Sequence, residues 1–211
     1  MLELKDITFG FDNKEKKPLV RNLSFSVKKG EIIFITGKSG LGKSTLLNLI
    51  SGFCDKKLIW TGEIFLNNRD ISHVNIQKKR IGYMLQDYFL FPHFDVKNNL
   101  IFALPRETKN KKAYVLNLLD KIHMSKFSNS FPSELSGGQK ARIACLRSVI
   151  SKPNALLLDE PFSSLDKITK KQFQNFLFSF LKKINIPCII VTHELIKTHT
   201  GCKELNISNF T

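Results

Sequence analysis

A short stretch of the chain combines glycines with a lysine and hydroxyl residues, and it directly follows an apolar run, Ile32 to Thr36, that is typical of a buried strand. The stretch consists of Gly37, Lys38, Ser39, Gly40, Leu41, Gly42, Lys43, Ser44 and Thr45. Glycines let the backbone turn its N–H groups inward, where with a helix N-terminus they form a concave site for phosphate oxygens. Lys43 adds a positive charge, Ser44 offers a hydroxyl to a magnesium ion, and Thr45 can reach an inner phosphate. Because an apolar helix is expected at Lys43 to Ser51, the stretch predicts a nucleoside triphosphate site with Mg²⁺ rather than a surface loop that matches by chance.

Other polar residues follow predicted apolar strands, at the points where those strands end. They are Gln86 after Ile81 to Leu85, the pair Asp159 and Glu160 after Ala155 to Leu158, and His193 after Pro187 to Thr192. The repeated order of strand, loop and helix indicates a mostly parallel sheet, in which the carboxyl ends of the strands share one edge. These side chains should therefore surround the same triphosphate as the glycine-rich stretch.

Each of these side chains suits a separate task. Asp159 is expected to hold the magnesium ion, and Glu160 to act as general base for the attacking water. Gln86 can contact both the metal shell and the water, and His193 can donate to the terminal phosphate. Standing alone, an Asp-Glu pair could cap a helix or lie on the surface, and an isolated Gln or His would be structural. Beside a phosphate loop, we interpret Glu160, His193 and Gln86 as catalytic. Ser44, Gln86 and Asp159 are the expected metal ligands.

A second glycine-containing helix start consists of Ser136, Gly137, Gly138 and Gln139. Two glycines and a serine at a helix N-terminus form an anion site, but this one has no lysine of its own. It could be an ordinary cap with glycines as turn residues. It could also complete a phosphate site that belongs to another subunit, so that two chains would close over shared nucleotides.

The remaining pattern predicts an α/β protein. Two antiparallel strands, Leu2 to Phe11 and Leu23 to Val27, precede the phosphate loop. Helices interrupt the strands between residue 87 and about 149, and Asp166 can cap a long helix with a phenylalanine-rich apolar stripe. We expect a P-loop NTPase core with a mostly parallel sheet, an antiparallel β subdomain and an inserted helical lobe.

Length and composition narrow the class of protein further. With 211 residues, the chain suits a single domain, residues 1–211. Its net charge of +15 predicts attraction to nucleic acid, anionic lipid or an acidic partner, without choosing among them. Cys145 and Cys188 lie within apolar patterns, which favours core residues in a reducing compartment. We expect a cytosolic protein, because the sequence has no signal-peptide pattern and no apolar run approaching the ~18 residues that span a bilayer.

The chain resembles ATP-binding cassette (ABC) proteins, through motifs that occur in that family's order. After the phosphate loop these are Leu135 to Gln139, similar to the family's signature; Ala155 to Pro161, with the two carboxylates; Ser163 to Asp166, similar to its D-loop; and Val191 to Glu194, similar to its switch histidine. Phe11 resembles the family's adenine-stacking aromatic less closely, and at the end of the first strand it could equally be a core residue. The resemblance implies that the chain binds ATP and Mg²⁺ and hydrolyses ATP.

The resemblance also implies partners. Two chains would pair head to tail, with Ser136 and Gly138 of one chain contacting the γ-phosphate that Lys43 of the other holds. Closure of this homodimer on ATP would be coupled, through the region after Gln86, to transmembrane permease subunits and a separate substrate-binding protein. The subunit would then lie peripherally on the cytoplasmic face of the inner or plasma membrane.

The segment from Gly82 through His93 to Val96 resembles bacterial importers of small solutes in particular, which would place His93 on the docking surface. Short length suggests a subgroup near the thiamine-type and oxyanion-type importers, and because little sequence follows His193 we expect no regulatory C-terminal domain.

The alternative to an importer subunit is a soluble ABC ATPase that acts on nucleic acid or ribosomes. Such relatives generally carry two fused cassettes, a coiled-coil insertion or a zinc module, so nucleic acid is not an expected partner.

Overall fold

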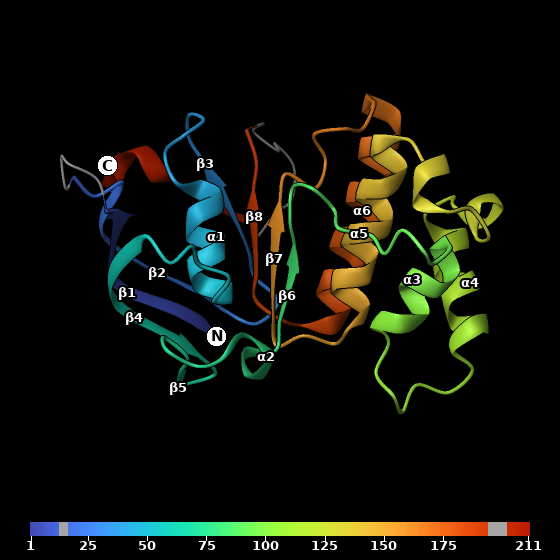
Figure 1. Cartoon of the computed structure of the whole chain (residues 1–211), viewed down its shortest axis with the longest axis horizontal. Helices are drawn as coiled ribbons and strands as arrows, with labels where there is room; N and C mark the ends of the chain where they lie inside the picture. The colour runs from blue at the N-terminus through green and yellow to red at the C-terminus, as the bar shows by residue number, and fades with distance from the viewer. Residues whose placement is uncertain (13–16, 194–201) are drawn as a thin grey trace.

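In the computed structural model, which describes residues 1–12, 17–193 and 202–211, the chain folds into two β-sheets with helices between and beside them (Figure 1). The antiparallel sheet has the order β2-β1-β4-β5, with β1 Leu2–Phe11, β2 Val20–Val27, β4 Leu58–Leu66 and β5 Arg69–Asp70. The parallel sheet has the order β6-β7-β8-β3-β9, with β6 Ile81–Met84, β7 Ala155–Asp159, β8 Cys188–Val191, β3 Ile32–Thr36 and β9 Cys202–Asn206. Glu194, in the segment similar to the switch histidine, lies outside the described residues.

Both faces of the central strands β3, β7 and β8 are buried, which explains their continuous apolar runs. In β3, Ile33 and Ile35 pack with the antiparallel sheet and with α1 (Lys43–Ser51). The alternate residues Ile32 and Phe34 pack with helices on the other face. Figure 1 shows α1 between the two sheets, and α5 (Gly137–Ile150) and α6 (Lys167–Ile184) on the opposite side of the parallel sheet. The expected α/β architecture with parallel and antiparallel sheets is confirmed.

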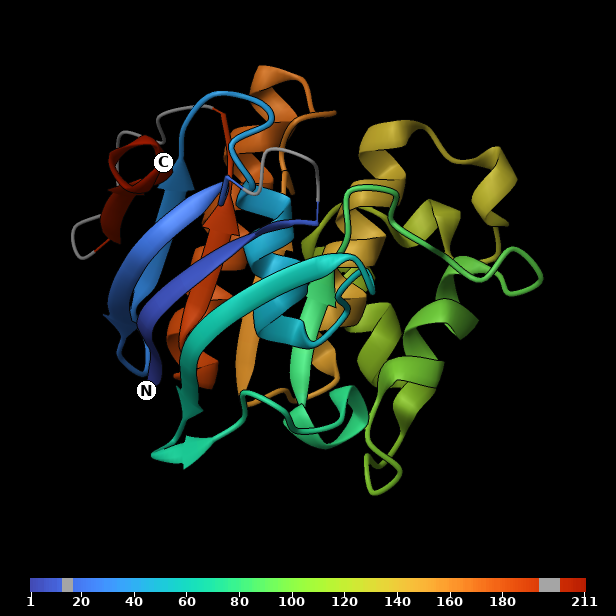
Figure 2. The same cartoon turned by 60° about the vertical axis from the view of Figure 1, so that its left-hand side comes forward.

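A lobe of helices stands beside the parallel sheet in both views (Figures 1 and 2). It contains α3 (Val96–Ala103), α4 (Lys111–Lys121) and two 3₁₀ turns, Ser125–Phe127 and Pro132–Glu134. Helix α5 contacts α3 as well as β6 and β7, so it joins the lobe to the sheet. A further short helix, α2 (Ile76–Lys79), precedes β6. Among the described helices, none combines the length and apolar character that a membrane span requires.

Side-chain caps mark the starts of two helices, and the predicted cap at Asp166 is one of the two. Asp95 accepts a hydrogen bond from the backbone N–H of Asn98 at the start of α3, and Asp166 accepts from two backbone N–H groups at the start of α6. Carboxylates are favoured at these positions because they satisfy N–H groups that have no partner within the helix. The predicted helix Lys43 to Ser51 is confirmed as α1. Cys145 and Cys188 are confirmed as fully buried.

The strand predicted within Pro187 to Thr192 is confirmed as β8, and a further strand that was not predicted, β9, pairs in parallel with β3 at the far edge of the sheet. β9 is an edge strand with half-exposed and exposed side chains, so it has no apolar run to reveal it. Backbone pairing with β3 places it, and polar side-chain contacts add to that pairing. Lys203 forms a 2.7 Å ion pair with Glu31, and Thr36 Oγ1 donates to Glu204 Oε1 at 2.8 Å.

Candidate nucleotide-binding site

The carboxyl ends of the parallel strands meet above the sheet, and a cavity of about 400 Å³ opens there. Its lining includes residues from each of the predicted groups at the strand ends, namely Lys43, Ser44, Gln86, Asp159, Glu160 and His193. Ser39, Gly40, Gly42 and Thr45 of the phosphate loop also line it, whereas Gly37, Lys38 and Leu41 belong to the loop without lining the cavity. Strands far apart in sequence thus bring one set of polar side chains together.

The turn of the phosphate loop into α1 requires glycine. Gly42 is the N-cap of α1, with φ 86° in the left-handed region. A Cβ atom at this position would lie 3.0 Å from the buried ring of Phe9. Any side chain would therefore both strain the backbone and displace a core aromatic.

The Lys43 ammonium lies inside the loop. Its Nζ donates to the carbonyl oxygens of Gly37 at 2.9 Å and Lys38 at 2.8 Å, and the residue is 6% exposed. Burial lowers the pKa of Lys43, while the carboxylates of Glu160 and Asp159 favour its charged form. A positive charge is thus held between the loop and the two acidic residues.

Asp159 provides the best test of whether a magnesium ion fits. The residue is 3% exposed, and its Oδ1 finds no hydrogen-bond partner among the described residues. Burial raises the pKa of Asp159, whereas the Ser44 hydroxyl, Lys43 and His193 lower it. An unpartnered carboxylate oxygen beside a serine hydroxyl offers the oxygen ligands that Mg²⁺ prefers, so the residues fit the ion.

The backbone of Glu160, next to Asp159, is in the left-handed region, with φ 50°. Its side chain, 11% exposed, approaches the ring of His193, with 3.3 Å between Glu160 Oε1 and His193 Nε2. This contact lacks hydrogen-bond geometry, and Oε1 has no hydrogen-bond partner in the described part of the chain. Burial raises the pKa of Glu160, which makes the carboxylate a stronger base. Glu160 and His193 both line the cavity, and Glu160 Oε1 is available to accept a hydrogen bond.

Phe11 lies at the end of β1, and its ring is 39% exposed rather than buried in the core. It lines the cavity together with Leu19, next to the phosphate loop. An exposed ring beside an aliphatic side chain offers two apolar surfaces for a planar base. Sequence reasoning missed Leu19, because a single leucine after a polar loop carries no signal of binding.

The second glycine-containing helix start does not line this cavity. Ser136 is the N-cap of α5, and it forms a capping box in which Ser136 Oγ accepts from Gln139 N and Gln139 Oε1 accepts from Ser136 N. Ser136 and Gly137 are exposed, and Gly138 and Gln139 are half-exposed. The N-terminal end of α5, residues Ser136 to Gln139, is named the tip of α5. It is accessible to a second molecule, although the same geometry also serves as an ordinary cap.

Gly138 has a requirement that the sequence did not reveal. A Cβ atom there would lie 2.9 Å from the carbonyl oxygen of Ser164 and 2.9 Å from the side chain of Leu165. The start of α5 thus packs directly on the segment that follows Glu160. Ser163 of that segment lines the cavity as well.

A separate surface lies between β6 and α3. The rings of Phe91, His93, Phe94 and Phe102 contact one another, with centroids between 4.5 and 6.0 Å apart, and we name them the aromatic patch. Phe102 is 65% exposed. Large apolar side chains gathered at the surface are typical of a contact site for another protein.

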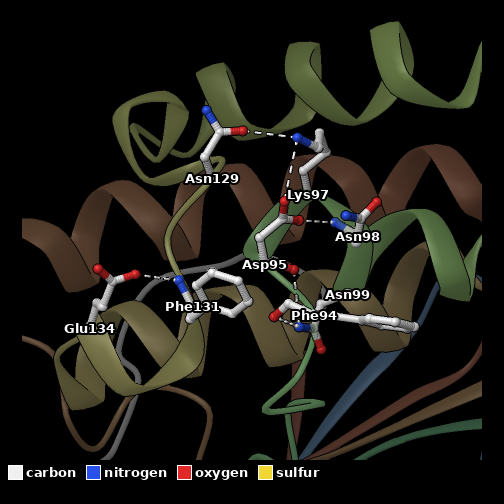
Figure 3. A network of polar contacts seen from close by, with 8 residues as sticks. All are labelled: Phe94, Asp95, Lys97, Asn98, Asn99, Asn129, Phe131 and Glu134. Atoms are coloured by element: carbon white, nitrogen blue, oxygen red, sulfur yellow. Dashed lines mark hydrogen bonds and ion pairs between the residues drawn. The ribbon is translucent and has the colours of Figure 1, made fainter.

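Asn99 holds the backbone of the aromatic patch in place (Figure 3). Its fully buried amide donates to the carbonyl oxygens of Phe91, Phe94 and Asp95 at 2.9 to 3.1 Å, and it accepts from Phe91 N. Nearby, Lys97 Nζ lies 3.4 Å from Asp95 Oδ2 and donates to Asn129 Oδ1 at 2.8 Å. The start of α3 is therefore tied both to the patch and to the segment that precedes α5.

Replacing Asn99 with alanine is expected to lower the free energy of unfolding by about 3 kcal/mol, because several buried backbone groups would lose their partner. Chemical denaturation monitored by circular dichroism measures the change. The exposed neighbour Asn98 provides the control, since its alanine variant keeps every bond of Asn99 and should cost less than about 0.5 kcal/mol. Equal losses in the two variants would contradict the role assigned to Asn99.

Comparison with known protein families gives a consistent result. A model of the family described as "ABC transporter" matches residues 20–163. The chain is 35% identical to the putrescine transport ATP-binding protein PotG of Escherichia coli (strain K12), over 99% of this chain and 55% of PotG. It is 38% identical to the spermidine/putrescine import ATP-binding protein PotA of Borreliella afzelii (strain PKo), over 99% of this chain and 60% of PotA. The chain thus spans somewhat more than half the length of these relatives.

Among solved structures, a dimeric post-hydrolysis state of the ATP-binding cassette MJ0796, bound to ADP and Pi, has a similar fold. The TM-score is 0.79 at 26% sequence identity, and the match covers 92% of this chain and 88% of the other.

Proposed function

Because the chain belongs to the ABC transporter family, we propose that it is an ATP-binding and ATP-hydrolysing subunit that energises a membrane importer of a small solute. The observation that supports this most is the cavity that Lys43, Asp159 and Glu160 share. Carboxylate oxygens without a hydrogen-bond partner among the described residues lie there beside a lysine and a serine hydroxyl. Such a set is suited to a metal-bound triphosphate and a water molecule.

In this proposal, residues Gly37 to Thr45 bind the phosphates of ATP, and Phe11 stacks on the adenine. Ser44, Gln86 and Asp159 would hold Mg²⁺, which when bound neutralises charge on the outer phosphates. Glu160 accepts a proton from the attacking water, and its raised pKa suits a general base.

His193, 3.3 Å from Glu160, orients that carboxylate and donates to the terminal phosphate. Gln86 contacts the water. In this proposal residues 1–211 form a single domain, in which a helical lobe at about 87–149 is inserted in a P-loop core, and α5, at the end of that range, contacts both α3 and strands β6 and β7.

A second copy of the chain would complete the site. The exposed Ser136 and the half-exposed Gly138 lie at a helix N-terminus, where backbone N–H groups favour an anion. We propose that Ser136, Gly137, Gly138 and Gln139 contact the ATP bound by the partner copy. The dimeric state of MJ0796 supports a homodimer.

The aromatic patch is the proposed docking surface for transmembrane permease subunits, and His93 belongs to it. The exposed rings of Phe102 and His93, beside the half-exposed Phe91 and Phe94, suit a helix or loop of an apolar partner. The names of PotG and PotA, which describe transport and import of polyamines, support the importer assignment. The subunit would lie on the cytoplasmic face of the membrane, with a separate substrate-binding protein on the other side. Membership of a subgroup near the thiamine-type and oxyanion-type importers stays a prediction.

The proposal is tested by phosphate release from ATP with the purified chain. We expect release with Mg²⁺, loss of release in a chelator, and a rate that rises more steeply than linearly with chain concentration, since two copies form the site. No release under any of these conditions would contradict the proposal.

The alternative of a soluble ATPase that acts on nucleic acid finds no support in the relatives' names. It would regain support if the chain bound RNA or DNA in a salt-sensitive manner without associating with membranes.

A further inference from the structure

The two residues before Leu90 adopt an unusual backbone conformation. Tyr88 has φ 59° and Phe89 has φ 40°, both in the left-handed region that bulky side chains rarely occupy. They lie two and three residues after Gln86. Strained conformations of this kind persist only where surrounding contacts fix them, and they gather at functional sites.

Arg147 of α5 supplies the first of these contacts. Its guanidinium donates through Nη1 to the carbonyl oxygen of Phe89 at 2.8 Å and through Nη2 to that of Tyr88 at 2.9 Å. The same group lies 5.4 Å from the ring centroid of Phe91. A planar, forked donor is suited to holding two adjacent carbonyl groups at once.

The side chain of Tyr88 supplies the second contact. Its hydroxyl lies 2.8 Å from Ser164 Oγ, so the two share a hydrogen bond. Ser164 belongs to the segment between Glu160 and α6, on which Gly138 also packs. Strands β6 and β7, which precede Gln86 and Glu160, are neighbours in the sheet. The segments after these two strands are thus hydrogen-bonded to each other, and both contact α5, the first through Arg147 and the second through Gly138.

We propose that Tyr88, Arg147 and Ser164 form a brace that fixes the distance between Gln86 and Glu160 during hydrolysis. The brace residues act through other groups, so they are positioning residues. Arg147 keeps residues 88 and 89 in their strained form, and that form presents the Tyr88 hydroxyl to Ser164. A movement of the helical lobe would then displace Gln86 and Glu160, which follow β6 and β7, together. The inference rests on the proposed ATPase function.

A double-mutant cycle tests the brace. Tyr88→Phe and Ser164→Ala each remove the same hydrogen bond, and each is expected to lower kcat about fivefold with the Kd for ATP unchanged within about twofold. The double variant should lose no more than either single variant. Additive losses, about 25-fold in the double variant, would overturn the proposal.

Tyr83→Phe is the matched control. It removes a hydrogen bond of the same length, from the Tyr83 hydroxyl to Asn48 Oδ1 at 2.8 Å, on the strand that precedes Gln86. We expect a similar loss of thermal stability but a kcat within about twofold of the parent chain. A kcat loss equal to that of Tyr88→Phe would show that the effect is one of general stability, and would overturn the brace.

Hydrogen exchange measured by mass spectrometry gives a readout that does not depend on hydrolysis. In Tyr88→Phe and in Arg147→Lys, whose single ammonium cannot replace the forked donor, peptides covering residues 85–91 and 161–166 should both exchange faster. Unchanged exchange in residues 161–166 would overturn the brace. If the parent chain does not hydrolyse ATP, the proposed function fails, and the exchange data still decide whether the brace exists.

Discussion

Replacing Glu160 with glutamine is expected to lower ATP hydrolysis by about a hundredfold or more, with ATP binding intact. Glutamine has nearly the same shape as glutamate, but its amide cannot accept a proton from water. The side chain is only 11% exposed, so bulk water cannot easily replace it as the base. Because ATP would bind but persist, the ATP-bound pair of chains should accumulate.

Phosphate release at saturating ATP measures the effect, and equilibrium binding of a fluorescent ATP analogue checks that the site still forms. Glu63→Gln makes the same chemical change at an exposed position of β4 and should leave hydrolysis unaltered. A loss of less than about tenfold in Glu160→Gln would remove this residue from the role of general base.

Replacing Ser136 with arginine is expected to reduce hydrolysis about as strongly, again by about a hundredfold, for a different reason. The residue does not line the cavity of its own chain, so the single chain should bind ATP with unchanged affinity. An arginine at the exposed tip of α5 would instead block the approach of the partner copy. The lost cap bond to Gln139 costs about 1 kcal/mol, which the fold can tolerate.

Ser133→Arg is the control for Ser136→Arg. Ser133 is exposed on the 3₁₀ turn just before the tip, so this variant adds the same bulk and charge without altering the tip itself. It should retain at least about half of the parent rate. If Ser136→Arg hydrolyses ATP as fast as Ser133→Arg, the tip has no part in the site.

The sequence predicts the elements that carry a strong local signal. The phosphate loop and α1 are predictable because glycines, a lysine and hydroxyl residues directly follow an apolar run, and α6 is predictable because Asp166 caps it. β9 carries no such signal, since an edge strand needs no apolar run. Its place beside β3 depends on backbone pairing with Ile32 to Thr36, residues distant in sequence, and polar contacts with Glu31 and Thr36 add to it.

The grouping of site residues could be predicted for a topological reason, because the carboxyl ends of parallel strands meet at one edge. The contacts between the loops that follow those strands could not be predicted from the sequence. The hydrogen bond between Tyr88 and Ser164 depends on a left-handed backbone at residues 88 and 89. Neither tyrosine nor phenylalanine is a residue type that predicts this conformation. The packing of Gly138 on Ser164 could not be predicted either, because a glycine at this position also suits a simple helix cap.

The most direct test of the account measures the mass of the Glu160→Gln chain in solution by light scattering, with and without ATP and Mg²⁺. We predict that ATP converts this variant from a single chain to a dimer, and that adding Ser136→Arg to it keeps the ATP-bound protein as a single chain. A Glu160→Gln variant that binds ATP yet remains a single chain would contradict the claim that two copies complete one site, as would a dimer that forms equally well when Ser136→Arg is present.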